Sequence, residues 1–274
     1  EEMGLCWHAL GDYRKAFLCF KEAKRRISFA DLDVNRSVLT RYMETLAQRF
    51  SEPETIPWTP TPPLHRPSPV FIIGFNESGI SELGHLLNQH PKLSLAPEVS
   101  GIDSARRALS PKDPLELHSL RGDEIQKARS AYFERMAPRV QDDSIIIDAL
   151  PMNALALAII HRLFPNSLIL RCVRHPCEAV LRTFFKTYDL NAVTCHFDRL
   201  ERTATTYLAT TAVSGAIESS LNIRVHPLRV EEFMAAPQAT FSAIAKGIGV
   251  HDMNVDVPPM SPLDIWPKYK AEMS

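Results

Sequence analysis

The feature that most constrains this chain is an apolar strand that runs directly into a glycine-containing turn and a helix. The stretch is residues 69–81, PVFIIGFNESGIS. From Gly74 to Ser81 the spacing is G-x-x-x-x-G-x-S, with Ile80 where a Walker loop carries its lysine. Backbone N–H groups at the start of a helix favour an anion, and Ser78 and Ser81 add hydroxyl donors. The spacing predicts a phosphate cradle without the lysine, and an ordinary strand-to-helix turn is the alternative.

Composition is typical of an ordinary globular enzyme. The chain has 274 residues, of which 45% are hydrophobic, and a formal net charge of −1, which allows one large domain with a small appendage. This charge argues against a nucleic-acid-binding surface. The longest apolar run, residues 154–160, is too short to span a bilayer, so we expect no membrane span.

Cysteine usage and the start of the chain bear on its compartment. Five cysteines are scattered without the spacing of metal ligands, which favours a reduced, cytoplasmic location. No signal sequence is visible. The first residue is Glu1, so the sequence leaves open whether further repeats or a targeting segment precede it. Oligomeric state is also left open.

Residues 1–50 have a pattern of their own. Between residues 10 and 23, small and aromatic residues such as Tyr13, Ala16 and Phe20 have the spacing of the second half of a tetratricopeptide repeat. A helix at 33–50 would complete this unit. Because such arrays need about three repeats, we expect a truncated segment, or a helix pair that packs directly on the next domain, with a possible protein partner. Any amphipathic helical hairpin is the alternative.

Prolines mark the boundary after this segment. Residues 51–68 contain six of them, which remove backbone donors and fix φ, so we expect an extended linker between domains rather than a helix or a central strand. A proline-rich ligand for another protein is the alternative function. Residues 69–274 then form the main domain.

Strand and helix patterns alternate through residues 69–274. Strands are predicted at 70–73, 92–95, 144–147, 168–172 and 223–228, and helices at 80–89, 123–136, 153–164, 176–188, 196–219 and 237–248. This order predicts a P-loop-type α/β fold, with a parallel sheet flanked by helices. Ligands of such sheets bind at the carboxyl ends of the strands. The turn after Ile73, Asp148 and Arg174 all fall at such ends.

Several segments in the same order resemble the sulfotransferase superfamily, in particular its tetratricopeptide-repeat-linked members. The loop at 76–81, NESGIS, resembles the family's P-R-S-G-T-S, and His90-Pro91 followed by Glu98 resembles its next landmark. The matching segments further along are DALPMN at 148–153, LRCVRHP at 170–176 and LRVEEF at 228–233. The resemblance runs in register from about residue 69 to about residue 250.

This resemblance implies transfer of a sulfuryl group from 3′-phosphoadenosine 5′-phosphosulfate to an acceptor hydroxyl or amine. Such a transfer needs donors around the phosphosulfate, cations on the leaving group and a base, and it requires no metal. The residues implied to bind the nucleotide donor are Gly74, Ser78, Gly79, Ser81, Arg174 and Arg182, and the implied base is Glu98. The acceptor could be a peptide, a carbohydrate or a small molecule. A helix-start carboxylate is the plain alternative for Glu98, as a surface ion pair is for Arg174.

The loop departs from the family pattern where charge matters most. Glu77 stands where the family has a cation, and Ala149 replaces a lysine. Arg182 stands where the family has a serine, which adds donors to the 3′-phosphate site. Two hypotheses therefore stay open. The first is an active sulfotransferase in which Arg174, Arg182, Arg171 or a C-terminal basic residue such as Lys268 compensates. The second is a catalytically impaired member that acts by binding nucleotide or protein. A P-loop kinase is disfavoured because Ile80 replaces the Walker lysine.

Overall fold

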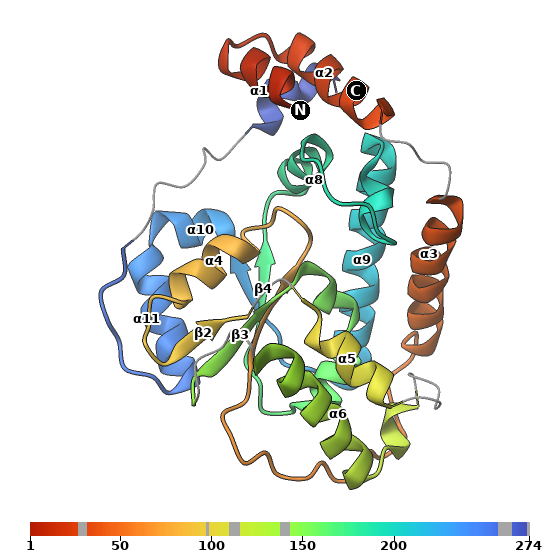
Figure 1. Cartoon of the computed structure of the whole chain (residues 1–274), viewed down its shortest axis with the longest axis vertical. Coiled ribbons are helices and arrows are strands. Elements are labelled where there is room, and N and C mark those ends of the chain that lie inside the picture. The colour runs from red at the N-terminus through yellow and green to blue at the C-terminus, as the bar shows by residue number, and fades with distance from the viewer. Residues whose placement is uncertain (27–31, 97–98, 110–115, 138–142, 257–264, 273–274) are drawn as a thin grey trace.

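The computed structural model of the chain describes residues 1–26, 32–96, 99–109, 116–137, 143–256 and 265–272 (Figure 1). At its centre lies a five-stranded sheet in the order β2-β3-β1-β4-β5, and each neighbouring pair is parallel. The strands are β1 (Val70–Gly74), β2 (Leu93–Leu95), β3 (Ile145–Ala149), β4 (Ile169–Val173) and β5 (His226–Arg229). The predicted α/β class with a parallel sheet is confirmed.

Helices precede and separate these strands. The α-helices are α1 (Glu2–Ala9), α2 (Tyr13–Arg26), α3 (Leu32–Arg49), α4 (Ile80–Leu87), α5 (Gly101–Ala108), α6 (Gly122–Met136), α7 (Leu157–Leu163), α8 (Pro176–Phe185), α9 (Leu200–Leu221), α10 (Val230–Ala235) and α11 (Pro237–Ile248). Short 3₁₀ helices are η1 (Leu117–Ser119), η3 (Pro151–Leu155), η4 (Thr194–Phe197) and η5 (Trp266–Glu272).

Side chains of β1 alternate between two hydrophobic cores, one on each face of the sheet. Phe71 and Ile73 pack with apolar residues of α3, α5, α6, α7 and α9. Val70 and Ile72 pack with those of α4, α10 and α11. Figure 1 shows these two helical layers on opposite sides of the strands. Because all five residues of β1 are buried, this central strand reads as a continuous apolar run rather than an alternating one.

Element boundaries differ from the prediction where local capping decides them. The strand predicted at 223–228 begins only at His226, because the preceding residues close α9. There Asn222 adopts a left-handed conformation with φ 49°, and the backbone N–H of Ile223 donates to the carbonyl of Glu218 at 3.0 Å. This is the Schellman arrangement of a helix end. The predicted helix at 153–164 is likewise divided into η3 and α7 by Ala156.

Helix α3 lies beside α9 in the sheet domain (Figure 1). Its buried residues Leu39, Met43 and Leu46, together with Phe50 directly after it, belong to the same core as Phe71 of β1. The sequence pattern predicts that this helix completes the N-terminal unit, whereas its apolar face packs in the helical layer over the sheet. The division of the chain at residues 50 and 68 stays a prediction.

The proline-rich segment is held against the sheet domain by two buried arginines. Arg129 of α6 donates from Nε to the carbonyl of Leu163 and from its guanidinium to the carbonyl of Pro62 at 2.9 Å. Arg162 of α7, whose side chain is 1% exposed, donates to the carbonyl of Thr59 at 2.8 Å. Because these bonds satisfy carbonyls in a segment without helix or strand, the linker has a defined path along the domain.

The N-terminal helix pair packs directly on α8 and η5. The contact is a cluster of aromatic residues, in which Phe20 stacks on Phe185 with ring centroids 4.1 Å apart, and Tyr269 is fully buried. His8 also forms a hydrogen bond with the Tyr269 hydroxyl at 2.7 Å. These helices therefore pack directly on the next domain, and the expectation that further repeats precede them stays a prediction.

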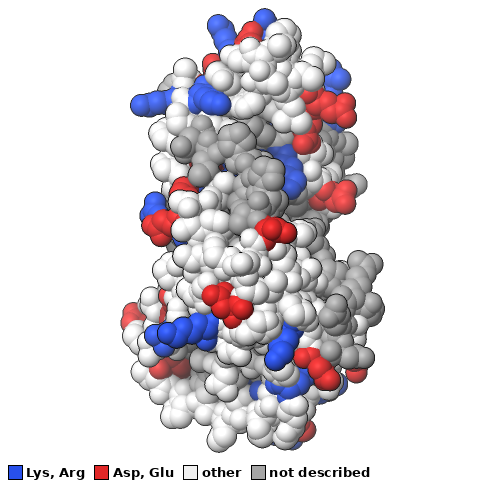
Figure 2. Space-filling view, turned by 90° about the vertical axis from the view of Figure 1, so that its left-hand side faces the viewer, with Lys and Arg blue, Asp and Glu red and all other residues white. Residues whose placement is uncertain are grey.

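Charges are mixed on the face that Figure 2 shows, which is the left-hand side of Figure 1. Side chains of both signs are scattered over a mostly white surface. Among the described residues, no helix combines the length and the apolar character needed to cross a bilayer.

Candidate active site

The crevice of the sheet lies between the carboxyl ends of β1 and β4. The chain leaves β1 toward β2 on one side of the sheet, and it leaves β4 toward β5 on the other. Ligands of open parallel sheets bind where the strand order reverses in this way. The predicted loop and Arg174 are therefore brought to the same crevice, one from each strand.

The loop after β1 is packed tightly on β4. A side chain at Gly74 would place its Cβ 2.6 Å from the carbonyl oxygen of Cys172, which leaves no room for any residue but glycine. Ser78 is 2% exposed, and its hydroxyl donates to the carbonyl of Phe75 at 2.7 Å. This hydroxyl closes the turn from within. Its predicted contribution to the anion site therefore competes with an internal hydrogen bond.

Helix α4 begins directly after this loop. Gly79 is its N-cap in a left-handed conformation, with φ 93°, and the first helical hydrogen bond runs from Leu83 N–H to the carbonyl of Gly79 at 3.1 Å. The N–H groups of the first turn of a helix have no acceptor within the helix and point along its axis. Ser81 is exposed in this first turn. The first turn of α4 therefore lies where the anion cradle is predicted, and its binding of an anion stays a prediction.

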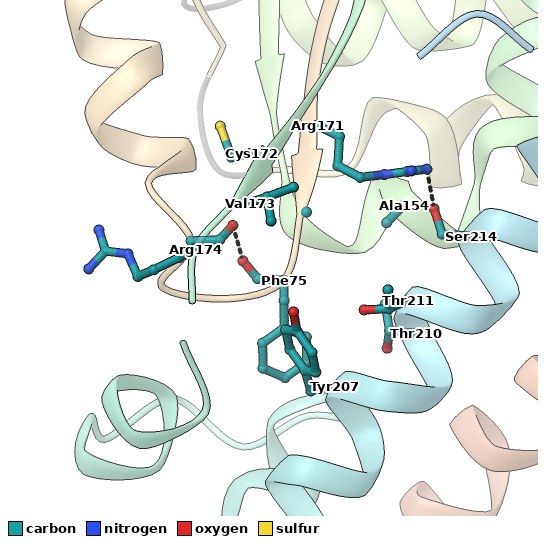
Figure 3. A pocket seen from close by; sticks show the side chains of 12 residues that line it. Phe75, Ala154, Arg171, Cys172, Val173, Arg174, Tyr207, Thr210, Thr211 and Ser214 are labelled. Atoms are coloured by element: carbon teal, nitrogen blue, oxygen red, sulfur yellow. Dashed lines mark hydrogen bonds between the residues drawn. The ribbon is translucent and has the colours of Figure 1, made fainter. Parts of the chain in front are cut away.

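Arg174 follows β4 with its side chain 4% exposed. Its nearest carboxylate is that of Glu82 on α4, with a nitrogen-to-oxygen distance of 3.8 Å. Burial lowers the pKa of Arg174, and the positive charge of Arg182 lowers it further. The Nε of Arg174 is buried without a hydrogen-bond partner. In Figure 3 this side chain extends away from the pocket, on the opposite side from α9.

Arg182 lies on α8 and binds Glu178 one turn earlier, with 2.5 Å between Nε and the carboxylate. Glu178 is 1% exposed, and its other oxygen accepts from the backbone N–H of Trp266 at 2.9 Å. The guanidinium therefore neutralises a buried carboxylate that also fixes the start of η5. If Arg182 also bound the 3′-phosphate, as predicted, its guanidinium would contact a second anion in addition to Glu178.

Glu77 has φ 59°, a left-handed conformation that is uncommon for a residue other than glycine. Its carboxylate accepts from the ammonium of Lys186 at 2.9 Å and from the hydroxyl of Tyr188 at 3.1 Å. The negative charge in the loop is therefore neutralised from the end of α8. Ala149, the other departure from the family pattern, packs against α4 beside Gly84.

A pocket of about 70 Å³ opens beside the loop on the α9 side. Figure 3 shows Phe75 and Tyr207 at one end of it and Arg171 at the other. Arg171 is paired with Glu218 at 2.7 Å and with the Ser214 hydroxyl at 3.0 Å. This guanidinium is a wall of the pocket. Lys268, the other proposed compensating cation, lies 5.7 Å from the ring centre of Tyr13 in the N-terminal cluster.

Asp148 is the first residue of the predicted DALPMN segment and lies in a buried hydrogen-bond network. Its two oxygens accept from the Tyr132 hydroxyl at 3.1 Å and from the side-chain amide of Asn153 at 2.8 Å. Burial raises the pKa of Asp148 to about 7, although both hydrogen bonds act in the opposite direction. This aspartate fixes the turn between β3 and η3 from inside the core.

Stability should therefore decrease with rising pH because of Asp148. Its pKa in the folded chain lies above its ordinary value, so the stability it contributes is complete below about pH 4 and is lost as the pH rises through about 7. We expect the free energy of unfolding of Asp148→Asn, measured by urea denaturation from pH 5 to 8, to fall less than that of the parent chain. The difference should reach a few kcal/mol at most, at about 1.4 kcal/mol per pKa unit. Identical slopes would contradict this.

Glu98, the predicted base, lies outside the described residues. His90, its neighbour in the motif, is fully buried, and its ring nitrogens contact the Lys92 backbone N–H at 3.1 Å and His251 at 3.3 Å. His90 is thus tied to the residues that follow α11. No cluster of three or more potential metal-ligating side chains occurs in the part of the chain that the structure describes.

Comparison with known proteins finds a family match and similar solved structures. The Sulfotransferase family model matches residues 69–253. The chain belongs to this family. A sulfotransferase from Alicyclobacillus acidocaldarius is 18% identical, with 77% of this chain and 90% of that chain covered and a TM-score of 0.49. The sulfotransferase domain from the Synechococcus PCC 7002 olefin synthase is 16% identical over 72% of this chain and 78% of that chain, with a TM-score of 0.42. No curated protein matches.

Several polar residues around the loop were missed in the sequence. Lys186 and Tyr188 reach Glu77 across more than a hundred positions, so local spacing gives no signal for them. Glu178 could have been found, because Glu178 and Arg182 have the i, i+4 spacing of a helical ion pair.

Proposed function

We propose that this sulfotransferase moves a sulfuryl group from 3′-phosphoadenosine 5′-phosphosulfate to an acceptor hydroxyl or amine. The observation that carries the proposal is Arg174, a buried guanidinium whose Nε lacks a partner, at the strand end next to the loop. A buried donor without a partner is costly unless a ligand satisfies it. A phosphate group of the nucleotide would supply that acceptor.

The loop supports the other end of the donor. The N–H groups at the start of α4 are suited to the phosphosulfate, and Gly79 brings the backbone close because it has no side chain. The carboxylate of Glu77 is held by Lys186 and Tyr188, so its charge is compensated beside the site. The hydrogen-bond donors around the crevice therefore fit a nucleotide with anionic groups at both its 3′ and its 5′ position.

Within this scheme the residues divide the work. The bound nucleotide supplies the sulfuryl group. The backbone at Ser78 and Gly79 holds the 5′-phosphate, from which the sulfuryl group is transferred. Arg174 holds the 3′-phosphate and so fixes where the sulfur lies relative to the acceptor. Arg182 carries the structural bond to Glu178 and adds positive charge nearby. Glu98 is the residue that we assign as base.

Donor turnover tests this proposal. The purified chain is incubated with sulfur-labelled 3′-phosphoadenosine 5′-phosphosulfate and a panel of phenols, sugars, amines and tyrosine-containing peptides, and both the labelled product and the released nucleotide are measured. We expect transfer to at least one acceptor, and its loss in Arg174→Ala. Binding of the nucleotide without transfer to any of them would favour the second hypothesis, a catalytically impaired nucleotide-binding protein.

A further inference from the structure

An acidic residue occupies the loop position at which the resemblance places a cation, and a lysine from elsewhere in the chain is bound to it. The Lys186 ammonium lies 2.9 Å from Glu77 Oε1, and the Tyr188 hydroxyl donates to the same oxygen at 3.1 Å. The side chain of Lys186 is 53% exposed and that of Glu77 is 27% exposed. The ammonium is therefore fixed beside the loop while one side of it faces solvent.

A hydrogen bond from α8, in addition to the ion pair, holds the end of this helix against the loop. Thr183 of α8, which is fully buried, donates from its hydroxyl to the carbonyl of Asn76 at 3.2 Å. Asn76 directly precedes Glu77 in the loop. Lys186 directly follows the last residue of α8. Its position relative to the loop is therefore set by the hydrogen bond from Thr183 to Asn76 as well as by the ion pair.

The N-terminal helices hold the same segment from the other side. The buried ammonium of Lys24 on α2 donates to the carbonyl of Lys186 at 2.6 Å, and the backbone N–H of Thr187 donates to Glu1 at 2.8 Å. The Lys186 ammonium also lies 5.5 Å from the ring centre of Tyr188. Several contacts therefore fix the position of one exposed lysine. Neutralising a surface glutamate does not require this many contacts.

We propose that Lys186 supplies the cation of the phosphosulfate site that the loop itself lacks, with Glu77 as the residue that positions it. This inference rests on the proposed function. During transfer, the bond between sulfur and the bridging phosphate oxygen breaks and its electron pair stays on that oxygen. A bond forms between sulfur and the acceptor oxygen or nitrogen, whose proton passes to the base. The ammonium of Lys186 stabilises the charge that the leaving phosphate gains.

The first test removes the cation. We expect Lys186→Ala to lower kcat for donor turnover by about tenfold to a hundredfold, because one charged donor to the transition state is lost, and we expect Lys186→Arg to retain most of the rate. Lys246→Ala, on the exposed side of α11, is the matched control and should leave kcat unchanged. Thermal unfolding of each variant checks that it is folded.

The second test moves the cation back into the loop. In the Lys186→Ala background, Glu77→Arg should raise turnover by at least about tenfold over Lys186→Ala alone, since an arginine at position 77 takes over the role of the lysine. A folded Lys186→Ala variant with unchanged kcat, or a folded double variant that recovers nothing, would show that the pair only stabilises the loop.

The outcome for the parent chain separates this inference from the proposed function. If the parent binds adenosine 3′,5′-bisphosphate but turns over too slowly to compare, its affinity for 3′-phosphoadenosine 5′-phosphosulfate is compared in the same variants, with the same expected order. If the parent binds neither nucleotide, the proposed function and this inference both fail. If the parent turns over and the variants do not differ, only this inference fails.

Discussion

Replacing Arg174 with alanine should weaken the binding of adenosine 3′,5′-bisphosphate by about a hundredfold, which corresponds to roughly 2.7 kcal/mol. The guanidinium is 4% exposed, and water screens it little, so a charge-assisted hydrogen bond there is stronger than one at the surface. Isothermal titration calorimetry measures the change. Adenosine 5′-monophosphate, which lacks the 3′-phosphate, should lose much less affinity in the same variant.

A matched control comes from the neighbouring strand. Arg229 ends β5 much as Arg174 follows β4, but its side chain is 62% exposed and it pairs with Glu232 within one helical turn. Arg229→Ala should leave both affinities unchanged. If Arg174→Ala weakens the two nucleotides equally, then Arg174 holds the crevice together and does not recognise the 3′-phosphate.

Glu82 gives a change in the opposite direction. Its carboxylate lies 3.8 Å from the Arg174 guanidinium and competes with a bound phosphate for the same cation. In the parent chain the nucleotide must overcome this attraction and the repulsion between two anions. A tighter complex with Glu82→Gln would show that the phosphate enters the field of Arg174.

Replacing Gly79 with alanine should be among the most destabilising single changes in the chain. The added Cβ would lie 2.3 Å from Val230 Cγ2, and the residue would have to keep φ near 93°. Left-handed backbone costs an ordinary residue about 1–2 kcal/mol, and overpacking adds about 1–3 kcal/mol. We expect a loss of about 2–5 kcal/mol in the free energy of unfolding, measured with urea.

Two further variants separate these costs. Gly11 has φ 81°, with nothing within 4 Å of an added Cβ, so Gly11→Ala should show the backbone cost alone. Val230→Ala should make room, so that adding Gly79→Ala to it costs about 1 kcal/mol less than adding it to the parent. Equal costs for Gly79→Ala and Gly11→Ala would mean that the loop moves away from α10 freely, and that the close contact does not shape the cradle.

The sequence predicted the sheet because its central strand is short, apolar and followed by a recognisable turn. The same property placed Arg174 at the crevice, since strand ends in a parallel sheet lie on one edge. Helix α5 was missed, although Ser100 caps it by accepting from the backbone N–H of Asp103 at 3.0 Å. Its first position is Gly101, a residue that disfavours helix. Close packing explains why glycine occupies this position, because a Cβ at Gly101 would lie 2.5 Å from the side chain of Met136.

The charge balance of the site could not be predicted in this way. In the sequence alone, Glu77 is an anion at the loop position where the resemblance places a cation. In the folded chain the Glu77 carboxylate binds the Lys186 ammonium. This ion pair depends on the position of α8 and on the contact of the N-terminal helices with Lys186. Long-range ion pairs of this kind leave no periodic signal. The packing of α3 against α9 was missed because it is also a contact between segments far apart in the sequence.

The most direct test of a retained donor site is calorimetric titration of the parent chain with adenosine 3′,5′-bisphosphate, compared with adenosine 5′-monophosphate under the same conditions. We predict saturable binding with one nucleotide per chain, at least about tenfold tighter for the bisphosphate, which is a difference of about 1.4 kcal/mol from the 3′-phosphate. Absence of binding, or equal affinity for the two nucleotides, would contradict the assignment of the crevice between β1 and β4 as the sulfuryl-donor site.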